Sequence, residues 1–511
     1  WHNDTICTVE IKTHEREFSK INENVDKMEL NDSQKMKLTK TDEQLIKSLS
    51  ALPVDYWDFK DSDVREYTHG IHSYPAMMVC PISRNILKLV KEIHDTDTVL
   101  DPFAGSGTVL VEGMLSGINN VYGSDINPLA LYLSRIKTTH LDINLLQKET
   151  QMLFERINDS YDEFCLQIDN VDDVMRKVYH LDLTDKKGWG SDAPEFLNKY
   201  KADNCLEIEI PNFKNIGYWF KPRVILLLSL IKENINKIHD VSIREFVFVA
   251  FSETIRFVSN RRNGEFKMFR MQANKVDAFE PDVIKEFETI LNRNIEKMND
   301  FNEACSEIDS DSNVSIFRNS ATSLIDIPNN SVDLVITSPP YGDSRTTVAY
   351  GEYSRLSLQW LDLFELTDKE IMSIDKILMG GKKYRNGFEY TIPSETLRKS
   401  LEIIKDKDLE RAGDVYSFYL DLTDAIEAIS QKTKSGGYQF WVVGNRRVKD
   451  ELLMTDVIIS EIAKTYNLEH IYTIDRNIIN KVMPTLTSPT NKSGIKSSTM
   501  TNEHIVVLKK L

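Results

Sequence analysis

A short glycine-rich segment is the feature that most constrains how this 511-residue chain can fold. Residues 98–100 are apolar enough for a buried strand, and the turn Ala-Gly-Ser-Gly-Thr follows at 104–108. Residues 109–115 continue as an apolar helix, and residues 120–123 predict a second strand. A strand, a tight turn, a helix and a second strand make one β-α-β unit, which belongs in a mainly parallel sheet covered by helices.

The α/β rhythm returns late in the chain. Apolar runs of strand length occur at 315–317, 333–336, 438–443 and 504–509. In between, residues 141–310 lack strand-turn-helix punctuation and contain long helix-like stretches, for example 223–239 and 281–300. The simplest architecture is therefore an α/β fold in which one doubly wound, Rossmann-like sheet is interrupted by an inserted, mainly helical module.

Composition excludes several classes of protein. The longest apolar run, at 224–231, is far shorter than the roughly 20 residues that span a bilayer, so we expect no membrane protein. Five scattered cysteines without a CxxC pair predict a cytoplasmic protein with no disulfide framework and no metal site. The net charge of −16 rules out a uniformly basic nucleic-acid coat but not a local basic cleft.

The glycine-rich turn predicts a cofactor site. In Asp-Pro-Phe-Ala-Gly-Ser-Gly-Thr at 101–108, the glycines let the backbone approach a ligand, and the following helix offers unpaired N–H groups. Asp125, 18 positions after Gly107, stands where a ribose-binding carboxylate belongs at the tip of the second strand. Neither a Walker lysine nor a GxGxxG spacing is present, which speaks against a nucleoside triphosphate or a dinucleotide. The alternatives are a plain strand–helix turn and a helix cap.

A second constellation is Thr-Ser-Pro-Pro-Tyr at 337–341. The strand at 333–336 ends in two prolines, which cannot continue a ladder and which fix a rigid turn at the sheet edge. The carbonyl of Pro339 and the hydroxyl of Ser338 are acceptors, and Tyr341 adds a flat face. This set suits a planar ring that carries an exocyclic amine, although an ordinary proline-stiffened loop is the alternative.

Together, these two motifs resemble those of the S-adenosylmethionine-dependent DNA amino-methyltransferases. That family modifies cytosine N4 or adenine N6, usually in restriction–modification or phage-defence systems. The segments at 69–78, 436–445, 488–491 and 502–504 resemble further motifs of the family. The resemblance covers residues 56–130 and 315–511, and it implies a Rossmann-like methyltransferase sheet.

The resemblance implies S-adenosylmethionine as the cofactor, double-stranded DNA as the substrate, and a cognate restriction endonuclease or defence subunit as a partner. The residues that hold a flipped base would be Ser338, Pro339, Pro340 and Tyr341. Those that hold the cofactor would be His72, Tyr74, Pro75, Asp101, Pro102, Phe103, Ala104, Gly105, Ser106, Gly107, Thr108, Asp125, Ile126, Asn319, Ser320 and Ala321. The family often has Gly-Asp-Ala at 319–321, so Ser320 replaces a carboxylate that contacts the cofactor adenine.

The resemblance also divides the chain. The parts are an N-terminal helical arm at 1–62, a cofactor-binding part at 63–140, the inserted helical module at 141–310 and a catalytic part at 311–511. We assign target recognition to the module, because the family's recognition part lies between the two motifs or after the second. The most basic stretch of the module, at 255–275, is interleaved with phenylalanines, and its alternative interpretation is a solvated helix face. Its candidate DNA-binding residues are Arg256, Arg261, Arg262, Lys267 and Arg270.

Ser338 bears on the target atom. Family members with Asp or Asn before Pro-Pro-Tyr mostly modify adenine N6, whereas Ser is more frequent among cytosine N4 enzymes. A hydroxyl can both donate and accept, so Ser338 can serve the amine and the adjacent ring N3 of cytosine. We predict N4-methylcytosine, with adenine N6 as the alternative. An RNA or tRNA amino-methyltransferase and a non-catalytic DNA-binding subunit are two further alternatives.

Overall fold

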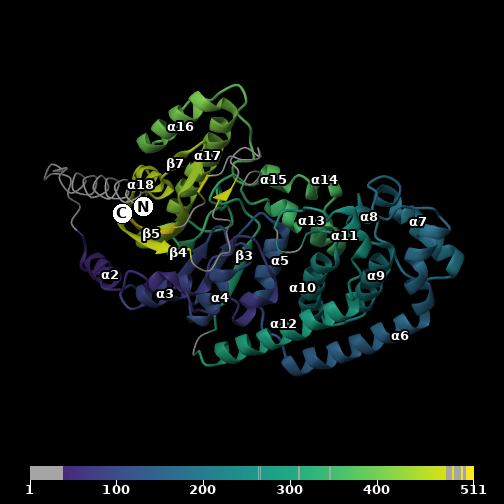
Figure 1. Ribbon diagram of the computed structural model, residues 1–511. Coiled ribbons are helices and arrows are strands. Elements are labelled where there is room, and N and C mark those ends of the chain that lie inside the picture. Colours follow the sequence, from purple (N-terminus) through teal and green to yellow (C-terminus); the bar gives the residue numbers. More distant parts are fainter. Residues whose placement is uncertain are drawn as a thin grey trace, which may run out of the picture.

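The computed structural model describes residues 38–262, 264, 266–308, 311–343, 347–478, 486–487, 497–498 and 502–511. A seven-stranded sheet of order β3-β2-β1-β4-β5-β11-β8 forms its centre (Figure 1). These strands are β1 (Thr98–Asp101), β2 (Asn120–Ser124), β3 (Asn313–Phe317), β4 (Val332–Thr337), β5 (Thr433–Gly444), β8 (Leu468–Asn477) and β11 (Asn502–Lys510). The first five strands in this order, from β3 to β5, run parallel to one another. Strand β11 is antiparallel to both of its neighbours, β5 and β8.

Helices cover both faces of this sheet. On one face, alternate strand residues such as Val99 and Leu334 join an apolar core with α2 (Lys40–Ser50), α3 (Cys80–Lys91) and α4 (Thr108–Leu115). On the other, their strand neighbours Leu100 and Val335 pack against α16 (Glu395–Lys407), α17 (Leu409–Lys432) and α18 (Thr455–Lys464). The sequence prediction of a doubly wound α/β sheet is therefore confirmed.

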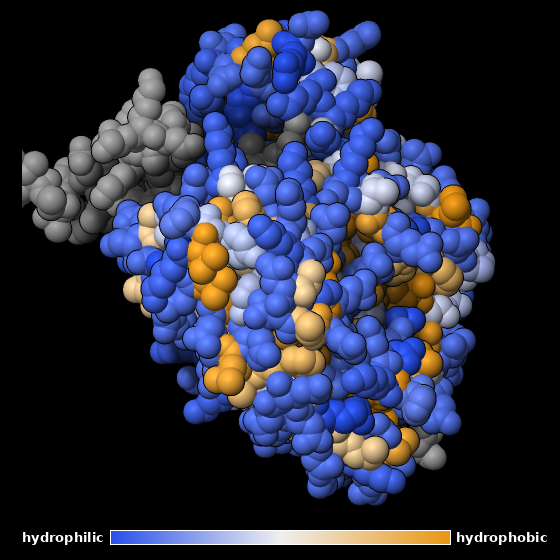
Figure 2. All heavy atoms as spheres, turned by 90° about the vertical axis from the view of Figure 1, so that its right-hand side faces the viewer, coloured by the Kyte–Doolittle hydropathy of each residue, from blue (hydrophilic) through white to orange (hydrophobic). Residues whose placement is uncertain are grey.

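Only helices stand between β2 and β3 in the described part of the chain, apart from one isolated bridge between Arg261 and Arg270. They are α5 (Pro128–Lys137), α6 (Ile143–Lys177), α7 (Trp189–Asn204), α8 (Ile216–Trp219), α9 (Pro222–Asn236), α10 (Val241–Val258), α11 (Ala273–Ala278) and α12 (Val283–Ser306). They lie beside the sheet (Figure 1), and the face of the molecule seen in Figure 2 is mainly hydrophilic with separate apolar patches.

The helical module shares its core with helices that come after the second motif. These are α13 (Tyr350–Leu361), α14 (Asp368–Ile371) and α15 (Ile374–Ile377). Trp360 of α13, for example, stacks edge-on against Phe220 and Phe251 of the module. One apolar cluster therefore joins the insertion to the catalytic half of the chain.

The predicted N-terminal arm is only partly described, since residues 1–37 lie outside the described residues. Its described helix α2 begins with a capping box between Thr39 and Asp42. Asp42 also accepts hydrogen bonds from Tyr438 of β5 and Lys509 of β11, each at 2.6 Å, which fixes the helix against the sheet.

The remaining elements are short. They are the 3-10 helices η1 (Tyr56–Asp58), η2 (Tyr67–Ile71) and η3 (Leu363–Glu365), the hairpin of β6 (Arg446–Val448) and β7 (Glu451–Leu453), and the pair β9 (Leu486–Thr487) and β10 (Ser497–Ser498). The predicted motif at 488–491 lies outside the described residues. Among the helices described, none has the length and apolar character to cross a membrane.

Candidate active site

The two sequence motifs meet at the centre of the sheet. Strands β1 and β4 are neighbours at the centre of the sheet. The strand order continues from β1 to β2 on one side and from β4 to β5 on the other. In doubly wound folds, ligands bind at the carboxyl ends of the strands where the order reverses in this way. The glycine-rich turn follows β1, and the Ser-Pro-Pro-Tyr turn follows β4. The hydroxyl of Thr337 donates to the Asp101 carboxylate at 2.7 Å, so residues 236 positions apart are directly bonded. The sheet therefore brings both motifs to one edge.

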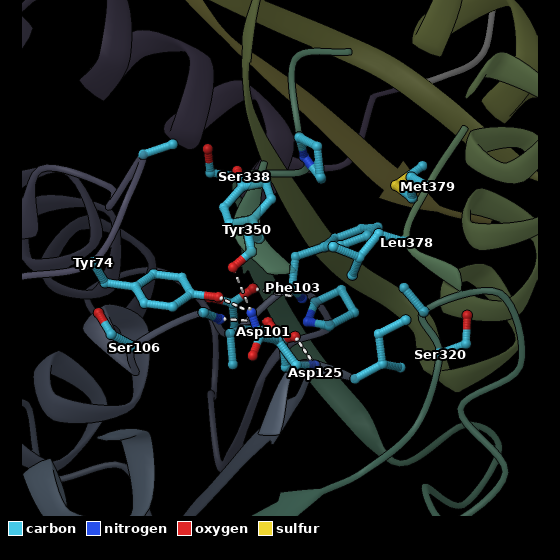
Figure 3. Close-up of a pocket in the computed structure, with 18 of the residues that line it drawn as sticks. Tyr74, Asp101, Phe103, Ser106, Asp125, Ser320, Ser338, Tyr350, Leu378 and Met379 are labelled. Carbon is cyan, nitrogen blue, oxygen red and sulfur yellow. Dashed lines mark hydrogen bonds between the residues drawn. The ribbon is translucent and has the colours of Figure 1, made fainter. Parts of the chain in front are cut away.

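A pocket opens at this edge (Figure 3). The predicted cofactor residues that line it are Tyr74, Pro75, Asp101, Pro102, Phe103, Ala104, Gly105, Ser106, Thr108, Asp125, Ile126, Asn319, Ser320 and Ala321. Ser338 and Pro340 of the second motif line it too. Among the described lining residues are three aspartates and no Lys, Arg or His. The pocket therefore presents acids and aromatic rings to a ligand.

Asp125 organises the glycine-rich turn from the tip of β2. One of its carboxylate oxygens accepts from the backbone N–H of Gly105 at 2.9 Å, and the other accepts from that of Asn127 at 2.8 Å. Asn127 in turn caps α5 and donates from its side-chain amide to the phenol of Tyr74 at 3.0 Å. These bonds hold the turn, the second strand and the segment before α3 around the pocket.

Two carboxylates, the buried Asp101 and the half-buried Asp125, give the pocket its electrostatic character. Burial raises the pKa of Asp101 to about 7, although the bonds from Thr337 and from the Phe103 N–H act in the opposite direction. Burial also raises the pKa of Asp125. Since a low-polarity surrounding disfavours an isolated charge, both groups gain from a cation placed between them.

Gly107 does not line the pocket, contrary to the sequence prediction. Its backbone is left-handed, with φ of +87°, and an added Cβ would lie 2.8 Å from the Cβ of Ser134 in α5. The residue is needed for the turn and for the close approach of α5. Gly105 does line the pocket, and there a Cβ would make ordinary contact with the Tyr74 ring at 3.6 Å.

His72 is also not among the residues that line the pocket, and its contact with a cofactor stays a prediction. Its ring is buried, with Nε2 paired to the hydroxyl of Ser252 at 3.0 Å and Nδ1 beside the Ser73 carbonyl at 2.5 Å. Burial lowers the pKa of His72 to about 4, which keeps the ring neutral. His72 therefore connects the segment at 72–78, which lines the pocket from Tyr74 to Met78, to α10 of the helical module.

Only part of the second motif lines the pocket. Ser338 and Pro340 reach the pocket, whereas Pro339 and Tyr341 are not among its lining residues. The phenol oxygen of Tyr341 lies 3.5 Å from the Ser338 hydroxyl. Contact of Pro339 and Tyr341 with a substrate base stays a prediction.

The basic stretch of the module is largely turned inward. Arg256 is 2% exposed, lies 3.5 Å over the Tyr353 ring and donates to the Tyr353 carbonyl. Arg261 is 6% exposed and donates to the carbonyl of Arg256. Both guanidinium groups therefore bond inside the protein in this structure, and phosphate contact by Arg256 or Arg261 stays a prediction.

The other three candidates of this stretch differ. Arg270 is half-buried and donates to the carbonyls of Tyr218 and Thr184. Arg262 is exposed beside the Phe269 ring, and Lys267 is half-buried. A role of Arg262, Lys267 or Arg270 in DNA contact stays a prediction.

Comparison with known proteins identifies the family. The chain is 38% identical over 483 residues to the type II methyltransferase M.MvaI of Kocuria varians, which covers 92% of this chain and 98% of that protein. The chain belongs to the type II methyltransferases. It is also 24% identical over 369 residues to the type II methyltransferase M.MjaII of Methanocaldococcus jannaschii, covering 62% of this chain and 67% of that one.

A family model described as an RMKL-like methyltransferase domain matches residues 65–167 of this methyltransferase. The match contains the segment at 72–78, the glycine-rich turn at 101–108 and Asp125. A solved rRNA methyltransferase, aviRa from Streptomyces viridochromogenes, is 10% identical over 90% of this chain and 94% of that chain. Its TM-score of 0.27 is too low to compare individual parts.

Several pocket residues of this methyltransferase escaped prediction. They are Asn127, Thr322, Tyr350, Ile377, Leu378, Met379 and Asp421, whereas Ala76, Met77 and Met78 belong to the segment at 69–78 that the sequence had indicated. Asn127 follows Asp125 so closely that the motif could have indicated it. Tyr350, Leu378 and Met379 reach the pocket (Figure 3) from a part of the chain that carries no local signal. Tyr350 and Leu378 pack against the core that α13 and α15 share with the module, and Met379 packs against the core of α16 to α18.

Proposed function

We propose that this methyltransferase transfers the methyl group of S-adenosylmethionine to the N4 amine of cytosine at specific sites in double-stranded DNA. A restriction–modification or phage-defence system is the setting that we propose, with a cognate endonuclease or defence subunit as its partner. The observation that carries the proposal is the bond between Thr337 and Asp101, which fixes Ser338 beside an acidic pocket at the centre of the sheet.

The chemistry of the pocket fits S-adenosylmethionine. The carboxylates of Asp101 and Asp125 and the rings of Tyr74 and Tyr350 favour a ligand that carries positive charge. The hydroxyl of Ser106 is buried, lines the pocket and has no hydrogen-bond partner in the described part of the chain, so it can serve a polar group of the ligand. When bound, the cofactor supplies a sulfonium methyl group, so that a carbon–nitrogen bond replaces a carbon–sulfur bond and the nitrogen loses one proton.

The chain's own residues prepare the amine. The nitrogen of cytosine N4 is a poor nucleophile because its lone pair is spread into the ring. Hydrogen bonds from its two N–H groups to the Ser338 hydroxyl and the Pro339 carbonyl favour a pyramidal nitrogen and return the pair to that atom. With no covalent enzyme intermediate needed, the rate depends on positioning, which can supply several kcal/mol. The base leaves the duplex at a cost of about a few kcal/mol, and stacking on Tyr341 would offset part of it.

The neutral side chain of Ser338 favours cytosine over adenine in this proposal. A carboxylate at the same position would face the lone pair of cytosine N3 and repel it, whereas a hydroxyl carries no such charge. Adenine N6 is the alternative product of the same site.

Sequence recognition belongs, in this proposal, to the helical module at 141–310. The parts at 63–140 and 311–511 build the pocket, and the module lies directly beside them (Figure 1). Two contacts between the module and the segment at 72–78 support this assignment, because His72 bonds to Ser252 and the Ser73 N–H donates to Glu253.

The test is product analysis. The purified protein is incubated with labelled S-adenosylmethionine and either duplex DNA or tRNA, and the nucleosides are separated by mass spectrometry. We expect N4-methyl-2′-deoxycytidine from DNA and no methylated nucleoside from tRNA, and the rate of a Ser338→Ala variant that still binds the cofactor should fall by about 100-fold or more. N6-methyl-2′-deoxyadenosine alone would overturn the base assignment, and methylation of tRNA alone would overturn the DNA assignment.

A further inference from the structure

The turn at 261–270, between α10 and α11, exposes two phenylalanine side chains. Its two end residues pair in an isolated antiparallel bridge, and the backbone is left-handed at Gly264, with φ of +88°. Beyond this point the side chains of Phe266 and Phe269 are 52% and 48% exposed. Two large rings left half in water on one turn form an apolar surface that a partner can cover.

The base of this turn is held by arginines that bond to the backbone of the module. The Nε of Arg261 donates to the carbonyl of Arg256 at 3.0 Å. The guanidinium of Arg270 donates to the carbonyls of Tyr218 and Thr184, at 2.7 and 2.8 Å. The exposed rings therefore stand on a fixed base, which lets them keep their position when they contact another molecule.

The turn also lies against the first turn of α13, which borders the pocket. The backbone N–H of Met268 donates to the Glu352 carboxylate at 2.7 Å, and the Phe266 ring lies 6.0 Å from the Tyr353 ring. Tyr353 in turn contacts Tyr74 edge-on at 5.8 Å, and Tyr74 lines the pocket. A single ring, that of Tyr353, thus stands between Phe266 and the pocket wall.

The charge of the turn suits DNA. Residues 261–270 contain four basic side chains and one acid, Glu265. Arg262 is exposed with its guanidinium 6.0 Å from the Phe269 ring, and Lys267 is half-buried. Positive charge beside apolar rings matches a phosphate backbone with stacked bases next to it.

We propose that Phe266 is a wedge, an apolar side chain that enters the base stack of the DNA where the target base leaves it. The inference rests on the proposed function, because only a base that turns out of the duplex leaves such a gap. Leaving the stack costs the contacts on both sides of the gap, and an inserted phenyl ring restores part of them. This role is the same for a cytosine and for an adenine target.

Two DNA substrates separate a wedge from a structural residue. The recognition site is first read from the positions that the wild-type protein methylates in plasmid DNA. One duplex then carries this site fully paired, and the other has an abasic position opposite the target base, which is therefore unpaired from the start. The kcat/KM of each variant is measured on both duplexes and divided by the wild-type value on the same duplex.

Phe266→Ala should lower kcat/KM on the paired duplex by about tenfold, because the gap loses one stacked ring. On the unpaired duplex the loss should shrink to about twofold, since an unpaired base leaves the helix at less cost. Phe266→Tyr keeps the ring and should stay near wild type on both duplexes. Cofactor affinity measured by calorimetry should be unchanged in both variants.

The matched control is Phe257→Ala, because Phe257 belongs to the same basic stretch and is 37% exposed, but it lines a separate groove beside α12. It should match the wild type on both duplexes. An equal loss on both duplexes in Phe266→Ala, no loss on the paired one, or a lowered cofactor affinity would overturn the wedge. A wild-type protein that methylates no duplex DNA would overturn the proposed function and the wedge with it, so the two failures are distinguishable.

Discussion

The turn at 101–108 and the basic stretch at 255–275 were both singled out from local sequence, but they differ in the structure. Nearly every motif residue of the turn lines one pocket, together with residues that stand far away in the sequence. In the basic stretch, Arg256 and Arg261 are turned inward and bond to backbone carbonyls. Pattern alone was a better guide to the first region than to the second.

The difference has a physical cause. Glycines and prolines restrict the backbone itself, so a strand followed by such a turn has few alternative paths. An arginine restricts nothing, since its long side chain reaches either solvent or an internal carbonyl and aromatic ring. Tyr353, which receives Arg256, comes from α13. No residue near Arg256 in the sequence indicates that its guanidinium group contacts this ring.

The largest effect is expected in the turn after β4. Ser338→Ala removes an acceptor that touches the reacting amine, and we expect the methylation rate to fall by about 100-fold or more. Cofactor affinity measured by calorimetry should be unchanged. Equal losses of rate and cofactor affinity would mean that Ser338 holds the cofactor and not the base.

The next effect concerns the folding of the basic stretch. Arg256→Ala leaves a cavity beside Tyr353 and a buried carbonyl without its donor, and we expect the free energy of unfolding to fall by about 2–3 kcal/mol. Urea denaturation measures this. The salt dependence of DNA binding by the folded variant should match that of the wild type. If the variant had wild-type stability but a weaker salt dependence of DNA binding, Arg256 would instead be a residue that contacts phosphate.

Sequence predicted the sheet and the first half of the pocket, for reasons that particular residues make clear. The strands around Leu100 and Val335 are short, mostly apolar and wholly buried, which is the pattern of a central parallel strand. Strand β8 escaped prediction because it lies at the sheet edge, where most of its residues are half-buried or exposed and no regular apolar pattern marks it. His72 and Gly107 were placed in the pocket by motif position, yet their contacts with Ser252 and Ser134 arise only from tertiary packing.

A smaller effect tests the electrostatics of the pocket. The pKa of Asp101 is raised to about 7, so the protonated form prevails below that pH and the carboxylate above it. Binding of a cation requires the carboxylate, and the affinity for S-adenosylmethionine should therefore rise by up to about tenfold from pH 6 to pH 8. The contribution of Asp101 to the free energy of unfolding changes in the opposite direction. It falls as the pH rises from about 4 to 7, because ionisation of a buried acid destabilises the folded state.

Calorimetry at several pH values measures this affinity, and Asp101→Asn is the matched control, since its amide cannot ionise. The variant should bind more weakly and with an affinity that does not change between pH 6 and pH 8. A pH dependence that persists in the variant would assign the titration to another group, with Asp125 the next candidate, because burial raises its pKa as well.

The smallest effect separates the exposed part of the basic stretch from its buried part. Arg262 is exposed, and Arg262→Ala should lower the slope of log affinity for DNA against log salt by up to about 0.9, the share of one phosphate contact. Arg398→Ala is the control, because that exposed arginine on α16 is paired with Glu395 and Glu402 and lies across the sheet from the module. An unchanged slope in Arg262→Ala would remove the last fully exposed arginine of the stretch from the DNA surface. Recognition would then be sought at 380–435 or in the C-terminal segment, where the sequence places further basic residues.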